Sequence, residues 1–368
     1  MRNKVISILF CVLLAAGIGA SAILPDKYYS ESEKRTLKQF PSLTAEEIFD
    51  GKLGDEIEQY LAEQFPARDG WVTVKTLAEL ASGKREIGGV FFADDGYLIE
   101  AHKSLPSKQA KTNIAALKML SDSLAKSNIE MRVILAPTAS QILSEKLPPF
   151  APNANQSAVI EYARKQGMNV VDVTGALSGH KDEYIFYKTD HHWTSLGAYY
   201  AYAEWRRAKG ETPEPIDAWT KRELCDNFRG TTYSKVNFPF APFDTIDAYF
   251  KRERHEVNYN NGEYVTDSIF EEKFLNGSDQ YAVFFNSNQA VTKINGSGSG
   301  KILIIKDSYA NCFRQFVVDD YAETHLIDLR FFTGKVTDYI RENGIAEVLV
   351  LYNIQNFSTD ISAARCFR

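Results

Sequence analysis

From residue 108 onward the chain alternates short, continuously apolar runs with segments of helical period. The segments read as helices are 108–127, 157–167, 195–210, 309–321 and 334–344. The runs between them read as strands: 131–138 (MRVILAPT), 168–174 (MNVVDVT), 301–308 (KILIIKDS), 324–329 (THLIDL) and 346–354 (AEVLVLYNI). Strands that are apolar on both faces and alternate with helices are typical of a parallel sheet covered by helices on both sides. We therefore predict an α/β domain over residues 108–368.

The N-terminal segment, residues 1–24, has a short basic start followed by an uncharged run from Val5 to Leu24. Such a run is about as long as a bilayer is thick, and the preceding basic residues favour export of the rest of the chain. This predicts a signal anchor over residues 5–24. The alternative is a signal peptide cleaved after Ala22, since ASA precedes that point. Both interpretations place the body outside the cytoplasm.

Residues 25–107 combine three patterns. Residues 25–43 are polar and read as a stalk, and the following stretch to Gly83 is helical in period, with Thr44 and Glu47 as a capping box. The sequence GVFFADDGYLIEA then reads as a hairpin with DDG as its turn. We expect a stalk, a helical segment and a hairpin ahead of the α/β domain.

Residues 211–300 break the alternation of strands and helices. They are rich in Asn, Tyr, Phe and Asp, and we read them as an insertion that carries short strands at the edge of the active site. The net charge of −6 and the absence of a basic run argue against nucleic acid as a partner. The four cysteines form no CxxC pair, so neither a zinc site nor a disulfide framework is expected.

Ser308 is a candidate nucleophile because it lies where a predicted strand turns into a helix. Ligands of open α/β sheets bind at the carboxyl ends of the strands. A serine there exposes its hydroxyl, and its own N–H lies at the positive end of the helix, where an oxyanion could be stabilised. The alternative is structural, with Asp307 or Ser308 serving only as the helix cap.

A serine nucleophile needs a base and an orienting carboxylate, and Asp190, His191 and His192 offer both. In extended backbone, residues two apart share a side, so Asp190 and His192 would serve one pocket while His191 faces elsewhere. Thr194 or Ser195 would cap the helix that follows. Three interpretations remain open from the residues alone: a Ser–His–Asp triad, a metal site made by the three residues, and a purely structural loop.

Several segments together resemble one protein family. They are TDHHWTSLGAYYAY, KILIIKDSYANCF and LIDLRFF, supported by IEQYLAEQFPARDGW, GGVFFADDGYLI, ILAPTASQILSEKLP and FRGTTYSKV. In this combination the chain resembles the DHHW family, exported bacterial proteins related to the SGNH-like acetyltransferases of the alginate acetylation machinery. The resemblance implies an SGNH-hydrolase-like, flavodoxin-like parallel sheet with a circularly permuted motif order.

The resemblance also implies roles for particular residues. The triad would run in the chain order Asp190, His192, Ser308. Candidate oxyanion or substrate-binding residues are Arg330, Asn353, Tyr309 and Trp193, with packing or capping as the alternative for each.

The implied activity is O-acetyl transfer or ester hydrolysis on a cell-surface or secreted polysaccharide. The resemblance implies a membrane acyltransferase that supplies the acyl groups, and we expect no cofactor and no metal. The alternative is a non-catalytic protein of the same fold that binds glycans or takes part in polysaccharide assembly.

Overall fold

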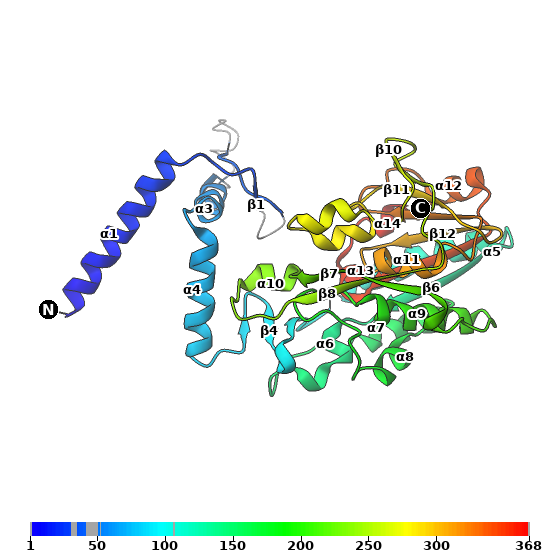
Figure 1. Cartoon of the computed structure of the whole chain (residues 1–368), viewed down its shortest axis with the longest axis horizontal. Helices are drawn as coiled ribbons and strands as arrows, with labels where there is room; N and C mark the ends of the chain where they lie inside the picture. Colours follow the sequence, from blue (N-terminus) through cyan, green and yellow to red (C-terminus); the bar gives the residue numbers. More distant parts are fainter. Residues whose placement is uncertain (1, 31–34, 42–50, 52, 106, 367–368) are drawn as a thin grey trace. The chain divides into compact units, whose positions relative to one another are not determined.

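The computed structural model describes residues 2–30, 35–41, 51, 53–105 and 107–366 (Figure 1). The chain divides into two compact units. The first comprises Met1–Gly88 with Tyr233–Phe240, and the second comprises Gly89–Thr232 with Ala241–Arg368. The predicted start of the α/β domain at residue 108 therefore lies inside the second unit, which also contains the hairpin.

The first unit is built from helices α1 (Arg2–Ile23), α3 (Leu53–Glu63) and α4 (Arg68–Ala81), with a short antiparallel pair, β1 (Tyr29–Ser30) and β2 (Arg35–Thr36). Among the described residues, no helix has the length and apolarity needed to cross a membrane. The predicted capping box at Thr44 and Glu47 lies outside the described residues.

The central sheet of the second unit has seven strands. In the order in which they lie side by side, they are β10 (Tyr264–Thr266), β9 (Val257–Tyr259), β11 (Val291–Asn295), β13 (Glu323–Asp328), β12 (Lys301–Lys306), β14 (Glu347–Asn353) and β6 (Glu130–Ala136). Strands β13, β12, β14 and β6 run parallel, whereas β11, β9 and β10 each run antiparallel to their neighbours. The predicted α/β class is confirmed, but the sheet is mixed rather than parallel throughout.

Both faces of the parallel strands are buried, which explains their continuous apolar sequences. On β12, Ile302 and Ile304 pack in the cluster that contains helices α9 (Ser195–Ala208) and α11 (Ala310–Val317). Leu303 and Ile305 pack in the opposite cluster. That cluster contains helices α5 (Ser107–Ala125), α7 (Ser157–Lys165), α12 (Val336–Asn343) and α13 (Ile354–Thr359). Because each fully buried side chain of this size stabilises the fold by about 1.5–3 kcal/mol, the two clusters hold the carboxyl ends of the strands firmly in place.

Two sequence predictions for this region are wrong in extent. Residues 168–174 contribute only one parallel bridge, Val170 with Val133, because the chain turns into α8 (Thr174–Gly179) directly afterwards. Helix α11 ends at Val317, four residues before the predicted end.

The insertion supplies β9, β10 and β11 to the sheet, as well as a separate antiparallel ribbon of β7 (Thr220–Phe228) and β8 (Asp244–Phe250). It also carries the 3₁₀ helix η5 (Gln280–Phe284). The expected hairpin is present as β4 (Val90–Phe92) and β5 (Leu98–Glu100), joined through η1 (Asp94–Gly96). The remaining elements are β3 (Glu86–Ile87), α6 (Ala139–Ile142), η2 (Ser144–Lys146), η3 (Ile216–Ala218), α10 (Thr231–Val236), η4 (Glu272–Asn276) and α14 (Ala363–Cys366).

Candidate active site

Ser308 stands at the carboxyl end of β12, immediately before α11. The residues on both sides of it are buried, whereas Ser308 itself is partly exposed. Asp307 prepares this turn: its Oδ1 accepts the Tyr309 N–H at 2.9 Å, and its Oδ2 accepts the Asn353 N–H at 3.0 Å. The side-chain amides of Asn353 and Asn356 donate to the same Oδ2 at 2.9 and 3.0 Å. Asp307 therefore fixes the turn ahead of α11, and the Ser308 hydroxyl is left for another partner.

That partner is His192. Its Nε2 lies 2.7 Å from Ser308 Oγ, and its Nδ1 lies 2.5 Å from Asp190 Oδ1. The His192 backbone N–H donates to the same carboxylate oxygen at 2.9 Å. An ionised carboxylate only accepts hydrogen bonds, so Nδ1 carries the proton and Nε2 presents its lone pair to the serine hydroxyl. The side chains are thus arranged as nucleophile, base and orienting acid.

The second carboxylate oxygen of Asp190 is held by a segment far away in sequence. Asp190 Oδ2 accepts the Thr231 N–H at 2.7 Å and the Thr231 hydroxyl at 3.0 Å. The chain approaches so closely at Gly230 that a Cβ there would lie 2.2 Å from both Cβ and Oδ2 of Asp190. Only glycine fits this position. The segment FRGTTYSKV resembles the family in sequence, but none of its residues was predicted to contact the site.

The loop before Asp190 is anchored by Asp244 at the start of β8. Asp244 Oδ1 accepts the Lys188 N–H at 2.8 Å, and Oδ2 accepts the Thr189 N–H at 2.7 Å and the Thr189 hydroxyl at 2.5 Å. The Tyr184 hydroxyl donates to the same carboxylate. The insertion thereby fixes the backbone that carries the base, which the sequence alone did not suggest.

Tyr281, on η5 of the insertion, covers His192. The two rings are parallel within 8°, with centroids 3.8 Å apart. Tyr281 is buried, and its hydroxyl lies 3.3 Å from the Ser308 carbonyl oxygen. The stacked ring limits rotation of the imidazole and excludes water from one of its faces. No sequence motif pointed to this residue.

Burial sets the protonation of His192. Removal of the ring from water lowers its pKa to about 4, and the neighbouring His191 adds to this shift, while Asp190 opposes it. His192 is therefore neutral near pH 7 and able to take the serine proton.

The oxyanion position predicted at Ser308 is compatible with the backbone. Within the described part of the chain, the Ser308 N–H donates to no protein acceptor. It lies at the N-terminal end of α11, where the partial positive charge of the helix favours an anion. The backbone can thus offer one donor to a developing negative charge.

The four predicted pocket residues occupy different positions. Asn353 lines a pocket beside the site and also binds Asp307. Arg330 donates from Nε to Asp328 Oδ1 at 2.8 Å and from Nη2 to Asp328 Oδ2 at 2.5 Å, so an ion pair engages its guanidinium.

Trp193 and Tyr309 have no exposed surface to offer a substrate. The Trp193 indole donates to the Tyr309 carbonyl oxygen at 2.9 Å, and the Tyr309 hydroxyl donates to the His191 carbonyl oxygen at 2.7 Å. Their expected substrate contact is therefore corrected to the packing alternative: the pair joins the histidine loop to the start of α11.

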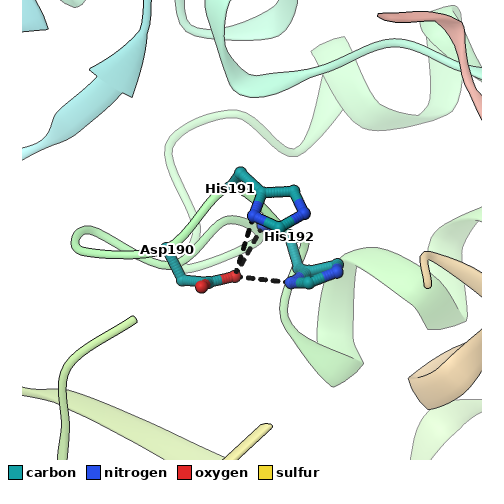
Figure 2. Close-up of side chains that lie close together, drawn as sticks. All are labelled: Asp190, His191 and His192. Atoms are coloured by element: carbon teal, nitrogen blue, oxygen red, sulfur yellow. Dashed lines mark hydrogen bonds and ion pairs between the residues drawn. The ribbon is translucent and has the colours of Figure 1, made fainter. Parts of the chain in front are cut away.

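The expectation that His191 faces away from Asp190 and His192 is wrong. The backbone at these residues bends rather than running as a regular strand, so side chains do not alternate. The rings of His191 and His192 lie 3.8 Å apart, and His191 Nδ1 is 3.8 Å from Asp190 Oδ1 (Figure 2). All three side chains converge.

This convergence bears on the metal interpretation. Among the described residues, Asp190, His191 and His192 form one group whose ligand atoms lie within 4.8 Å of one another. Several of those atoms already have partners: Asp190 Oδ1 binds His192 Nδ1, and His192 Nε2 binds Ser308. His191 Nδ1 lies 2.6 Å from Thr231 Oγ1. A metal and the hydrogen-bonded triad would therefore compete for the same atoms.

Comparison with known proteins agrees with this architecture. A model of the DHHW protein family matches residues 112–327, more than half of the chain. The fold is similar to that of a DHHW family protein from Eubacterium siraeum, with a TM-score of 0.66 and 24% identity over 76% of this chain and 95% of that one. It is also similar to Bacillus cereus PatB1, with a TM-score of 0.62 and 20% identity over 74% of this chain and 98% of that one.

A curated relative is the probable alginate O-acetylase AlgJ of Pseudomonas aeruginosa, 25% identical over 174 residues. The match covers 44% of each protein, so the chain spans less than half the length of that relative. The matched residues include the loop that carries Asp190 and His192 and the turn at Ser308. The chain belongs to the DHHW family.

Proposed function

We propose that this protein is an exported serine-dependent O-acyltransferase or acetylesterase that acts on a polysaccharide, with Asp190, His192 and Ser308 as its catalytic residues. The observation that carries the proposal is the continuous set of contacts from Asp190 Oδ1 through both His192 nitrogens to Ser308 Oγ, at 2.5 and 2.7 Å. The likeness to a probable alginate O-acetylase supports the reaction class. The chain order Asp–His–Ser, permuted relative to SGNH esterases, does not alter the chemistry, because geometry defines a triad.

The proposed first step forms an acyl-enzyme. Ser308 Oγ attacks the carbonyl carbon of an acyl ester while its proton passes to His192 Nε2. The Ser308 N–H stabilises the oxyanion, and Asp190 stabilises the imidazolium. The bond to the leaving alcohol then breaks, and His192 gives its proton to the departing oxygen. The acyl group remains on Ser308 as an ester.

The second step repeats the proton transfers in reverse. A sugar hydroxyl attacks the acyl carbon in the transferase reaction, and water attacks it in the esterase reaction. Because the acyl group must reach a site outside the cytoplasm, we propose that a membrane acyltransferase supplies it. For export we propose a signal anchor over residues 5–24, with a signal peptide cleaved after Ala22 as the alternative.

The test compares Ser308→Ala with the native chain on a small aryl acetate. We expect hydrolysis to fall by at least about 10³-fold, since the nucleophile is lost. Ser127→Ala is the matched control, because Ser127 is exposed and far along the chain from the site, and it should retain full activity. A sulfonyl fluoride should label Ser308, detected as a mass increase on its peptide.

Full esterase activity in Ser308→Ala would overturn the proposal. So would a native protein that turns over no acyl ester yet still binds glycans after His192→Ala. That second result would instead favour the non-catalytic, glycan-binding alternative.

A further inference from the structure

His191 lies inside the site, yet no step of the proposed mechanism uses its side chain. Its ring is tilted by 37° against that of His192, and 24% of the side chain is exposed. It lines the same pocket as Asp190 and Asn353. A partly exposed imidazole this close to the base is positioned to touch whatever enters the pocket.

The hydrogen bonds around Thr231 determine which nitrogen of His191 carries the proton. The single Thr231 hydroxyl proton must go to Asp190 Oδ2, 3.0 Å away, because a carboxylate can only accept. Thr231 Oγ1 can then only accept from His191 Nδ1, 2.6 Å away. In the neutral ring, Nε2 is therefore left with a free lone pair. Figure 2 shows this nitrogen on the side of the ring away from Asp190.

The pocket offers acceptors and negative charge rather than cations. Neither lysine nor arginine is among its lining residues, whereas Glu100 and Asp190 are. Gln355 also lines it, and its Oε1 is buried with no protein partner within the described residues. With His191 Nε2, this makes two acceptor atoms that need donors. Sugar hydroxyl groups supply donors, and a carboxylate does not.

We propose that His191 Nε2 accepts a hydrogen bond from a hydroxyl of a neutral sugar acceptor and thereby favours acyl transfer to the sugar over hydrolysis. This inference rests on the proposed function. In the transfer step, the attacking sugar oxygen bonds to the acyl carbon and its proton passes to His192 Nε2. The bond from the acyl carbon to Ser308 Oγ breaks, and Oγ regains the proton from His192. His191 binds a second hydroxyl of the same sugar, which water lacks, so only the sugar is held in place.

The test measures how one acyl-enzyme partitions between sugar and water. The full chain is given an aryl acetate as donor and a neutral hexose tetrasaccharide as acceptor, and acetylated sugar and free acetate are both quantified. Since both products arise from the same intermediate, their ratio is independent of the acylation rate. His191→Phe should lower this ratio about 5- to 10-fold, the effect of losing one hydrogen bond. An unchanged ratio would overturn the inference.

Two further variants separate the acceptor role from a structural one. His191→Gln places an amide oxygen near the position of Nε2 and should restore the ratio to within about 3-fold of the native value. Thr231→Val removes the acceptor for Nδ1–H but keeps the backbone N–H to Asp190, and should lower the ratio because the proton position is no longer set. A Gln variant as poor as Phe would contradict the proposal, and all variants are checked for native thermal unfolding.

A uronate tetrasaccharide provides the charge test. Because the pocket has two carboxylates and neither lysine nor arginine among its lining residues, we expect less transfer to the uronate than to the neutral sugar. Equal or better transfer to the uronate would overturn the expected preference for a neutral sugar. If the native chain forms no acyl-enzyme, the proposed function itself fails. If it hydrolyses the donor normally but transfers to sugar independently of His191, only this inference fails.

Discussion

At the scale of single residues, the site depends on one close approach. Gly230 passes so near Asp190 that no other residue fits, and the next residue, Thr231, supplies two donors to the carboxylate. The orientation of the acid is thus set by the backbone of a distant segment. This explains how the loop can hold a carboxyl group, that of Asp190, that is almost fully buried.

We predict that Gly230→Ala displaces Asp190. The added Cβ should reduce the free energy of unfolding by about 1–3 kcal/mol through overpacking and lower esterase activity by at least about tenfold. Thermal unfolding and steady-state kinetics measure the two effects. Gly175→Ala is the matched control, since its Cβ would meet nothing within 4 Å and it lies in helix α8. Native activity in Gly230→Ala would show that Asp190 does not need this position.

A second residue-scale prediction concerns pH. The proposed mechanism requires neutral His192, and burial lowers the pKa of His192 to about 4, so acidification removes the proposed base only below that value. We expect kcat/KM for an aryl acetate to stay constant from neutral pH to about pH 5 and to fall about tenfold per pH unit well below 4. A profile that loses half its activity near pH 6.5, the ordinary histidine value, would contradict this.

The same shift links acid to stability. His192 is harder to protonate in the folded state than in the unfolded chain, where a histidine has a pKa of about 6.5. The free energy of unfolding is therefore unaffected by His192 above about pH 6.5. It decreases as the pH falls from there toward 4, and the full loss is reached below about pH 4. Unfolding should be followed at each pH, so that loss of the base is separated from loss of the fold.

At the scale of elements, helix α11 and the insertion are fastened together by Arg314. This buried side chain on α11 donates from Nη2 to the carbonyl oxygens of Ile269 and Phe284, both in the insertion. Phe284 is the last residue of η5, the short helix that carries Tyr281 over His192. The helix after the nucleophile thus positions the ring that covers the base.

We predict that Arg314→Met loosens η5. Two buried carbonyl oxygens lose their hydrogen-bond donor, which destabilises the fold. Removing a buried charge offsets only part of this loss, so the free energy of unfolding should fall by about 2 kcal/mol. Esterase activity should fall as well, because the Tyr281 stack is less ordered. Arg341→Met is the control: this arginine on α12 is 71% exposed and should change stability by less than about 0.5 kcal/mol. Denaturant unfolding and limited proteolysis of the insertion test both.

The apolar pattern of the chain predicts some strands of the sheet correctly and one of them incorrectly. The strands β6, β12, β13 and β14 were predicted because burial on both faces leaves uninterrupted apolar runs. The segment at 168–174 is less uniformly apolar, because Asn169 and Asp172 interrupt it, and it pairs only at Val170. The chain turns into α8 at Thr174, so no longer strand forms there.

At the scale of the whole molecule, the site draws on parts of the chain that lie far apart. His192 and Ser308 are separated by 116 positions, and Thr231, Asp244 and Tyr281 come from the insertion or its start. The insertion is therefore part of the candidate site. The sequence predicted that it lies at the edge of the active site, but not which of its residues contact the triad.

The metal interpretation is tested on the whole protein. Because the hydrogen bonds of the triad engage the atoms that a metal would need, we predict that dialysis against a chelator leaves esterase activity within about twofold of the starting value. Elemental analysis of the untreated protein measures any bound metal. Loss of activity with the chelator, restored by a divalent cation, would favour a metal centre at Asp190, His191 and His192 instead.

Much of this protein was determined by its sequence alone: the α/β class, the main parallel strands, the place of Ser308 at the carboxyl end of a strand, and the choice of Asp190 and His192 as its candidate partners. Those features follow from periodicity and from the chemistry that a serine nucleophile requires. The tertiary structure decided the rest. It turned His191 toward the base, buried Trp193 and Tyr309, and brought Gly230 and Tyr281 to the triad. These contacts join residues that no local pattern connects, because close packing alone sets which distant surfaces meet.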